Sequence, residues 1–168
     1  RQKGTAGRKA RRQKGGVDMD TVIRSMKTED YQEVYKLWEC IKGFGLRSLD
    51  DSREGVDKFL RRNPGLSQVA VYGGRIVGSI LCGHDGRRGC LYHVCVHPDF
   101  RKRGIGRTMA REALHALKEE GICSVSLIAF KNNAGGNAFW KTIGWEFRED
   151  INCYDLKLNN SNLTSFNE

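Results

Sequence analysis

The chain has 168 residues, of which 39% are hydrophobic and 29% are charged. This length suits one domain with a core of its own, and the composition is that of a soluble globular protein. No apolar run approaches the roughly 18 residues that a membrane-spanning helix needs, and no apolar signal region stands near the N-terminus. We therefore expect a cytoplasmic protein with no membrane partner.

The net charge of +9 comes from one end of the chain. Residues 1–17 hold seven basic residues and no acidic one, and without them 22 basic and 20 acidic residues remain. We interpret residues 1–18 as a basic disordered tail. Three interpretations stay open: a nucleic-acid or ribosome-binding arm, the remnant of an Arg-rich targeting peptide, or a segment with no role in activity. For the folded domain we expect no nucleic-acid partner.

The six cysteines do not indicate a metal site. None of them forms a C-x-x-C pair, and at least four lie in apolar, strand-like stretches, where a free thiol behaves as a small hydrophobic group. We expect reduced cysteines and no bound metal.

The first half of the folded part combines strands with two helices. Thr28 and Ser52 are placed as N-caps, since apolar residues follow them at helical spacing. Gly73 and Gly74 separate two apolar runs, which is a strong hairpin signal. The expected elements are strands at 21–26, 68–72 and 75–82, and helices at 28–42 and 52–63.

The second half alternates strands and helices. A strand over Cys90–Val96 precedes a glycine-containing loop and a helix that Gly121 caps. We then expect a strand at 123–130, a helix at 134–143, one or two strands within 145–158, and a polar C-terminal tail at 159–168. The element order predicts one mixed α/β domain over residues 19–158.

The loop Arg101-Lys102-Arg103-Gly104-Ile105-Gly106 begins the helix that follows the 90–96 strand. The first N–H groups of a helix have no intrahelical partner and lie at the positive end of its dipole. Two glycines leave the backbone open to a ligand, and Arg107 adds to the positive charge of the loop. Such a helix start suits a pyrophosphate, although ordinary helix-start glycines beside solvated basic residues would give the same local pattern.

Two segments resemble the GNAT superfamily of N-acetyltransferases. The stretch from Val94 to Gly106 is similar to the family's signature, in which an Arg/Gln-x-x-Gly-x-Gly/Ala loop binds the pyrophosphate of coenzyme A. The stretch from Asn133 to Trp145 is similar to a later Asn-(x)6-Tyr-(x)3-Gly-Phe block. The resemblance implies a GNAT-like acyl-CoA N-acyltransferase fold. That fold has four helices and a central mixed, mostly antiparallel sheet of six to seven strands, splayed at the cofactor.

The resemblance also implies how acetyl-CoA is held as co-substrate. Its pantetheine arm would pair with backbone groups in a gap between two parallel strands, at 90–96 and 123–130. Its pyrophosphate would lie on N–H groups of the loop. The implied cofactor-binding residues are Val94, Cys95, Val96, Arg101, Lys102, Arg103, Gly104, Ile105, Gly106, Arg107, Asn133 and Trp140.

The implied reaction is direct attack of an amine on the thioester through a tetrahedral intermediate. Many family members carry a Glu at positions matching Cys90 or Tyr92, and this chain has no carboxylate there. His93 is the only side chain of that strand whose type titrates near neutral pH, but strict alternation turns it away from Tyr92 unless a bulge re-aims it. His93 is thus a candidate base or a structural histidine, and Tyr92 either orders a water or lines the cleft.

Trp140 stands where many members have a tyrosine that protonates the leaving thiolate. An indole cannot act as that acid, so the thiolate leaves unassisted, Tyr154 substitutes, or the site binds without reacting. The catalytic candidates are therefore His93, Tyr92 and Tyr154, and the alternative function is a catalytically weak acyl-CoA-binding or regulatory module. We expect a small-molecule or protein amine as acceptor, in a pocket near Arg47–Leu49, and leave a homodimer open.

Overall fold

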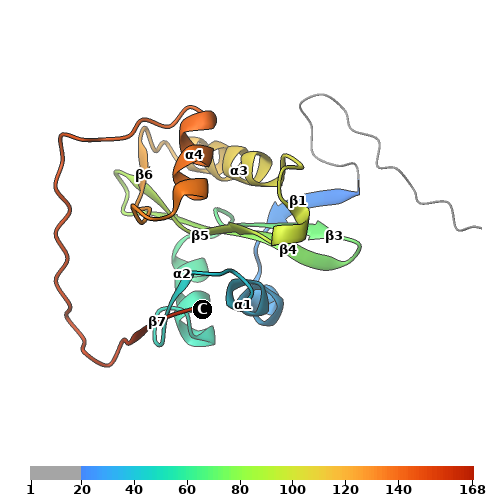
Figure 1. The fold of residues 1–168 in the computed structure, drawn as a ribbon, viewed down its shortest axis with the longest axis horizontal. Helices are drawn as coiled ribbons and strands as arrows, with labels where there is room; N and C mark the ends of the chain where they lie inside the picture. The colour runs from blue at the N-terminus through green and yellow to red at the C-terminus, as the bar shows by residue number, and fades with distance from the viewer. Residues whose placement is uncertain (1–19) are drawn as a thin grey trace, which may run out of the picture.

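The computed structural model describes residues 20–168, so the proposed basic tail lies outside the described residues. The described part contains seven strands and four helices, shown in Figure 1. In chain order they are β1 (Thr21–Ser25), α1 (Tyr31–Glu39), β2 (Gly45–Arg47), α2 (Arg53–Arg62), β3 (Gln68–Tyr72), β4 (Arg75–His84), β5 (Gly89–Val96), α3 (Ile105–Glu119), β6 (Val125–Leu127), α4 (Ala134–Thr142) and β7 (Thr164–Phe166).

A five-stranded sheet in the order β1-β3-β4-β5-β6 forms the middle layer. Its neighbours are antiparallel except β5 and β6, which are parallel. Helices α3 and α4 lie over one face, and α1 and α2 lie over the other (Figure 1). The mostly antiparallel sheet and the four helices confirm the predicted fold class. The described strands, however, are divided between this sheet and a small sheet of β2 and β7.

Two hydrophobic clusters fill the spaces between the layers. Trp38 and Val34 of α1 are fully buried in the cluster on the α1 and α2 face. Ile105 and Met109 of α3 are buried in the cluster on the opposite face. Each helix has apolar residues at helical spacing, so each presents one apolar stripe to the sheet. The sheet is therefore covered by helices on both faces.

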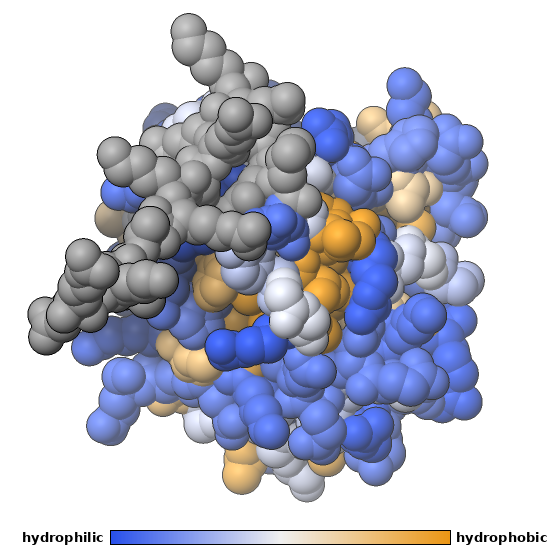
Figure 2. Space-filling model, turned by 90° about the vertical axis from the view of Figure 1, so that its right-hand side faces the viewer, coloured by the Kyte–Doolittle hydropathy of each residue, from blue (hydrophilic) through white to orange (hydrophobic). Residues whose placement is uncertain are grey.

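The outer surface is consistent with this layering. The side that carries β1 and the β3–β4 turn is hydrophilic over most of its area, with an apolar strip near its centre (Figure 2). Within residues 20–168, no helix combines the length and the apolar character needed to cross a membrane.

Of the two predicted N-caps, one is confirmed and one is wrong. The Ser52 hydroxyl accepts a hydrogen bond from the N–H of Gly55 at 3.0 Å and so caps α2. Thr28 instead lies in a 3₁₀ turn, and its hydroxyl donates to Oδ1 of Asp57 in α2 at 2.8 Å. The helix begins later, at Tyr31, because the Thr28 side chain is used to join two helices and does not satisfy its own helix end.

The C-terminal part departs furthest from the sequence prediction. The described residues 145–158 contain no strand, and this segment runs outward as an extended arm (Figure 1). Ile151, Leu156 and Leu158 on it are between 60% and 94% exposed. The polar segment 159–168, by contrast, contains β7, which pairs with β2 antiparallel. Alternating apolar residues permit a strand, but a strand also needs the edge of another strand to pair with. Here the more polar segment 159–168, and not 145–158, pairs with the edge of β2.

Gly55 allows a test of how α2 is seated. Helix propensity alone favours alanine over glycine by up to about 1 kcal/mol. A Cβ at Gly55, however, would overlap the carbonyl oxygens of Leu49 and Asp50. We expect Gly55→Ala to lower the free energy of unfolding by about 1–3 kcal/mol, measured by urea denaturation. Gly135 in α4 is the matched control, because a Cβ there meets no described atom within 4 Å. Equal stability of the two alanine variants would contradict the described packing.

Candidate functional site

The site lies where β5 and β6 separate. These parallel strands pair at three positions, from Gly89 with Val125 to Leu91 with Leu127. β6 then ends, while β5 continues to Val96. The edge of β5 over residues 92–96 opens into a cleft of about 2600 Å³. The expected gap between parallel strands is therefore present, although the second strand ends three residues before the predicted position 130.

The loop after β5 builds an open start to α3. Gly104 is the N-cap with a φ of +78°, and Lys102 also has a positive φ of +60°. A Cβ on Gly106 would lie 3.3 Å from the Phe139 ring and 3.7 Å from the Val96 side chain, so glycine keeps this approach uncrowded. α3 is 15 residues long, and its first turn lines the cleft with its unpaired N–H groups and positive dipole end. These features fit a pyrophosphate group.

The basic side chains of this loop also line the cleft. Arg101 Nε donates to the carbonyl of Val96 at 3.0 Å. Arg103 donates to the carbonyl of Asp99 at 2.9 Å, and its guanidinium lies 4.9 Å from the centre of the Phe100 ring. Both arginines therefore hold the loop in shape as well as adding charge. Val96 is one of the residues whose backbone groups the resemblance pairs with pantetheine, and its carbonyl accepts the hydrogen bond of Arg101.

A bulge interrupts β5 in the middle of the cleft. Its pairing with β4 steps from Ser79 opposite Cys95 to Leu81 opposite Tyr92, so β5 has one residue more than β4 over this stretch. His93 lies in the bulge with a φ of +49°, a conformation that is uncommon for a residue other than glycine. A bulge re-aims the side chains around it. Because of the bulge, the His93 side chain need not point to the face of the sheet that strict alternation would predict.

Buried polar groups support the bulge from the α1 side. The indole N–H of Trp38 donates to the fully buried Ser79 hydroxyl at 2.9 Å. That hydroxyl lies 3.4 Å from the His93 carbonyl oxygen, to which it donates. The backbone of the bulge is thus tied to α1 through two side chains.

The bulge brings His93 against a buried aspartate. His93 Nε2 lies 2.6 Å from Oδ1 of Asp51, which stands just before α2. The other oxygen of Asp51 accepts the N–H of Arg47 at 2.6 Å. The rings of Trp38 and Phe44 flank the imidazole, with centroid distances of 4.6 and 4.8 Å. Packing and hydrogen bonding together fix the orientation of this histidine.

This contact defines the tautomer of His93. An ionised carboxylate only accepts hydrogen bonds, so we assign the hydrogen to Nε2 of the imidazole. In the neutral ring Nδ1 then carries the lone pair. The His93 side chain is 19% exposed and that of Asp51 is 5% exposed, so the carboxylate is shielded while the ring still reaches the cleft. The arrangement suits a proton acceptor.

Asp51 is the site residue that sequence reasoning missed. The 90–96 strand contains no carboxylate, and Asp51 lies 42 positions earlier than His93 in the sequence. Its only signal is its place directly before the Ser52 N-cap. Acidic residues are common at helix starts for capping alone, so the sequence could not distinguish the two roles.

Tyr92 is one of the side chains that line the cleft. Its side chain is half exposed, and its ring meets Phe59 edge-on at 5.9 Å. Its interaction with the Cys90 side chain, together with burial, raises the pKa of Tyr92 to about 12. Tyr92 therefore stays protonated at neutral pH and can donate a hydrogen bond to a water or an acceptor.

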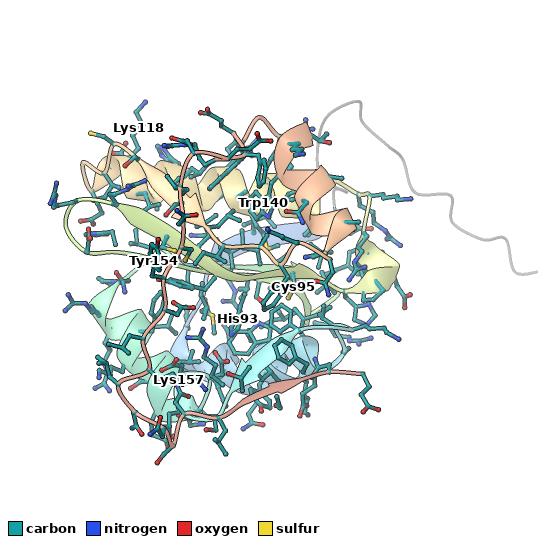
Figure 3. The ribbon with its side chains drawn as sticks, turned by 60° about the vertical axis from the view of Figure 1, so that its left-hand side comes forward. His93, Cys95, Lys118, Trp140, Tyr154 and Lys157 are labelled. Atoms are coloured by element: carbon teal, nitrogen blue, oxygen red, sulfur yellow. The ribbon has the colours of Figure 1, made fainter. Side chains whose placement is uncertain are left out.

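The remaining candidates fall into two groups. Trp140 and Asn133 both line the cleft. Trp140 packs between Phe139 and Trp145 at 4.9 Å from each ring, on the face of the sheet opposite His93 (Figure 3). Asn133 caps α4 by accepting the N–H of Gly136 at 2.9 Å. Tyr154 is 87% exposed on the arm and lies outside the cleft lining formed by the described residues.

The comparisons with known proteins identify the family. Residues 30–145 match the model of the Acetyltransferase (GNAT) family. An acetyltransferase of Sodalis glossinidius is 31% identical over 129 residues, which cover 77% of this chain and 89% of that protein. The chain therefore belongs to the GNAT family of acetyltransferases. It is an acyltransferase, and acetyl-CoA is its co-substrate.

Solved structures share the fold. The PaiA N-acetyltransferase of Thermoplasma acidophilum, in complex with coenzyme A, has a TM-score of 0.67 at 17% identity and covers 87% of this chain and 97% of that one. An aminoglycoside acetyltransferase from an uncultured soil metagenomic sample, in complex with sisomicin, has a TM-score of 0.65 at 18% identity, covering 83% and 97%. At these identities the likeness extends to the fold alone, so the acceptor must be argued from this chain's own residues.

Gly104 provides a test of the pyrophosphate site. Asn and Asp tolerate a positive φ better than other side chains, and they differ from each other mainly in charge. We expect Gly104→Asp to weaken acetyl-CoA binding about tenfold more than Gly104→Asn, because it brings a carboxylate to the phosphates. Calorimetric titration at low and high salt measures the affinity of each variant for acetyl-CoA. High salt screens the charge, so it should reduce the difference in affinity between the two variants. Equal affinities for the two variants at low salt would place the pyrophosphate elsewhere.

Proposed function

We propose that the protein transfers an acetyl group from acetyl-CoA to a primary amine by direct attack, with His93 as the general base and Asp51 as its positioning residue. The observation that carries this proposal is the 2.6 Å contact between His93 Nε2 and Asp51 Oδ1. It occurs at the bulge of β5, where the edge of that strand is open to the cleft.

The residues of the chain fit acetyl-CoA along this edge. The N–H groups at the start of α3 would hold the pyrophosphate, and backbone groups of Val94 and Cys95 would pair with the pantetheine arm. The carbonyl of Val96 would stay with Arg101, which already binds it at 3.0 Å. Asn133 would face the same arm from the start of α4. When bound, the thioester supplies the activated acetyl group.

The chemical step requires a neutral amine and a place for its proton. Alkyl amines are mostly protonated at neutral pH, so the ammonium must first release one proton to solvent, and the neutral amine then loses a second proton during attack. As the N–C bond forms, the amine proton passes to Nδ1 of His93, directly or through a water. A backbone N–H in the 94–96 stretch would stabilise the oxyanion of the tetrahedral intermediate. The C–S bond then breaks, and the thiolate takes a proton from solvent while the imidazolium returns its own.

Trp140 is compatible with this reaction because a thiolate leaves without acid help more readily than an amine does. The pKa of a thiol is far lower than that of the N–H of the attacking nitrogen. The thiolate is therefore the weaker base and the better leaving group. In this scheme Trp140 packs α4 onto the sheet between Phe139 and Trp145 and supplies no proton. The exposed Tyr154 has no part in the proposed step.

The function is tested by the release of free thiol from acetyl-CoA in the presence of primary amines and of peptides with free N-termini. We expect release that depends on the amine and saturates with it. Tight binding of acetyl-CoA without amine-dependent release from any member of the panel would contradict the proposal. It would support the alternative, a catalytically weak acyl-CoA-binding or regulatory module.

The His93–Asp51 pair makes a separate prediction. Asp51→Asn keeps an oxygen for the Arg47 N–H but no longer fixes the imidazole as a carboxylate does. We expect His93→Gln and Asp51→Asn each to lower kcat/KM for the amine by about 10²–10³-fold. The affinity for acetyl-CoA should change little, because neither side chain lies on the pyrophosphate loop.

The pH profile distinguishes a base from a structural histidine. The amine substrate must itself be deprotonated to attack, so every profile is expressed per concentration of neutral amine, which removes the titration of the substrate. On this scale the parent rate should still fall as pH decreases, because only a neutral imidazole accepts a proton, and His93→Gln should lose this dependence. Tyr92→Phe is the control. Because the pKa of Tyr92 is raised to about 12, removing its hydroxyl should leave the shape of the profile unchanged up to about pH 9. An acid limb that persists in His93→Gln would refute the role of His93.

A further inference from the structure

The C-terminal strand forms part of the cleft on the side of α1 and α2. β7 pairs with β2 so that Phe166 lies opposite Gly45 and Thr164 opposite Arg47. Phe166 and Thr164 both line the cleft. A Cβ on Gly45 would lie only 2.9 Å from the Phe166 ring, so the missing side chain lets the ring lie over the backbone of β2. The polar C-terminus thus contributes an aromatic side chain to the site.

Hydrogen bonds on both sides of β7 hold it in place. The Asn167 side-chain amide donates to the carbonyls of Trp38 and Ile41, at 2.7 and 2.9 Å, where α1 ends. Asn162 accepts the N–H of Leu49 through its side-chain oxygen at 3.0 Å. These bonds satisfy backbone groups that the end of α1 and the loop before α2 would otherwise leave open. β7 is therefore a fixed wall of the cleft.

Phe166 meets an aromatic side chain from the other side of the cleft. Phe130 follows β6, next to the proposed cofactor edge, and its ring centroid lies 5.7 Å from that of Phe166 at an interplanar angle of 65°. This is the edge-to-face geometry of rings in contact. Both rings line the cleft and are more than half exposed. They therefore form a contact between the two sides of the cleft, close to the surface of the protein.

Carboxylates accompany the aromatic pair on the acceptor side. Asp50 and Glu54 line the same cleft, and the Asn162 side chain donates to Asp50 at 2.8 Å. Basic side chains line the same cleft, and Arg47 lies 3.4 Å from Asp50, so the aromatic faces rather than the net charge are what would attract a protonated amine. The contact between the two rings narrows this part of the cleft, and a narrow molecule passes beside them more easily than a bulky ring system.

We propose that Phe130 and Phe166 form an aromatic gate that selects amines carried at the end of an unbranched chain and disfavours amines carried by a bulky ring system. The gate rests on the proposed function, because it concerns the acceptor of the same reaction. Phe166 would be a specificity-determining residue contributed by the last residues of the chain, and Phe130 its counterpart on the cofactor side.

The test compares two acceptors in the thiol-release assay. 1,5-Diaminopentane carries its amines on an unbranched chain, and sisomicin is an aminoglycoside whose amines lie on, or one carbon away from, its bulky rings. We expect the parent to prefer the diamine. Phe166→Ala and Phe130→Ala should each raise the ratio of kcat/KM for sisomicin to that for the diamine by about tenfold or more, the size of effect that steric discrimination in a pocket provides. The KM for acetyl-CoA should stay unchanged in Phe166→Ala, because Phe166 lies on the acceptor side.

Two features of the design keep the outcomes separate. Phe147→Ala is the matched control, because Phe147 is 61% exposed and lies outside the described cleft lining, so its ratio should equal that of the parent. Phe130→Ala removes one ring of the pair and leaves the residues of β7 unchanged, whereas Phe166→Ala alters the strand itself. A change confined to Phe166→Ala would indicate a loosened strand and overturn the gate.

The remaining outcomes are also decisive. If the parent acetylates the diamine and both gate variants keep its selectivity, the gate is wrong while the proposed function stands. A parent that acetylates sisomicin as efficiently as the diamine overturns the gate in the same way. If the parent releases no thiol with any amine, the proposed function fails and the gate fails with it.

Discussion

One additional residue in β5 turns His93 out of the strand's alternation and toward Asp51, and the rest of the site depends on this bulge. The positive φ of His93 is unfavourable for a residue with a side chain, so surrounding contacts must compensate. The buried Ser79 hydroxyl beneath the bulge and the flanking ring of Trp38 provide them. Without the bulge, the strand would run straight past the cleft and the imidazole would have no carboxylate partner.

The two faces of the sheet divide the work of the site. The face of α3 and α4 supplies the glycine loop and the N-terminal turn of α4, which fit the phosphates and the pantetheine arm. The face of α1 and α2 supplies Asp51, the ring of Phe44 and the C-terminal strand, which would face the acceptor in the proposed function. β5 lies between the two faces, and we propose that both reactants meet at its open edge. In this proposal the order of the layers sets where cofactor and acceptor bind, and the side chains then select the acceptor.

The features that could be predicted from the sequence are those determined by neighbouring residues. The loop around Gly104, the turn at Gly73 and the cap at Ser52 each depend on a few adjacent positions, and the structure contains all three. The bulge could not be located, because it depends on Trp38 and Ser79, which are remote from His93 in the sequence. The same holds for Asp51 and for β7, whose partners lie far away in the chain. Strands were expected at 145–158 because of alternating apolar residues, but alternation says nothing about whether a free sheet edge is within reach.

The central claim is that His93 and Asp51 act as one unit. A double-mutant cycle on kcat/KM for the amine tests it most directly, with His93→Gln, Asp51→Asn and the double variant measured together. When one residue acts only through another, removing both costs no more than removing the one that does the chemistry. The double variant should therefore be about as active as His93→Gln alone. Losses that multiply in the double variant would show that the two side chains act independently and would contradict the proposed base.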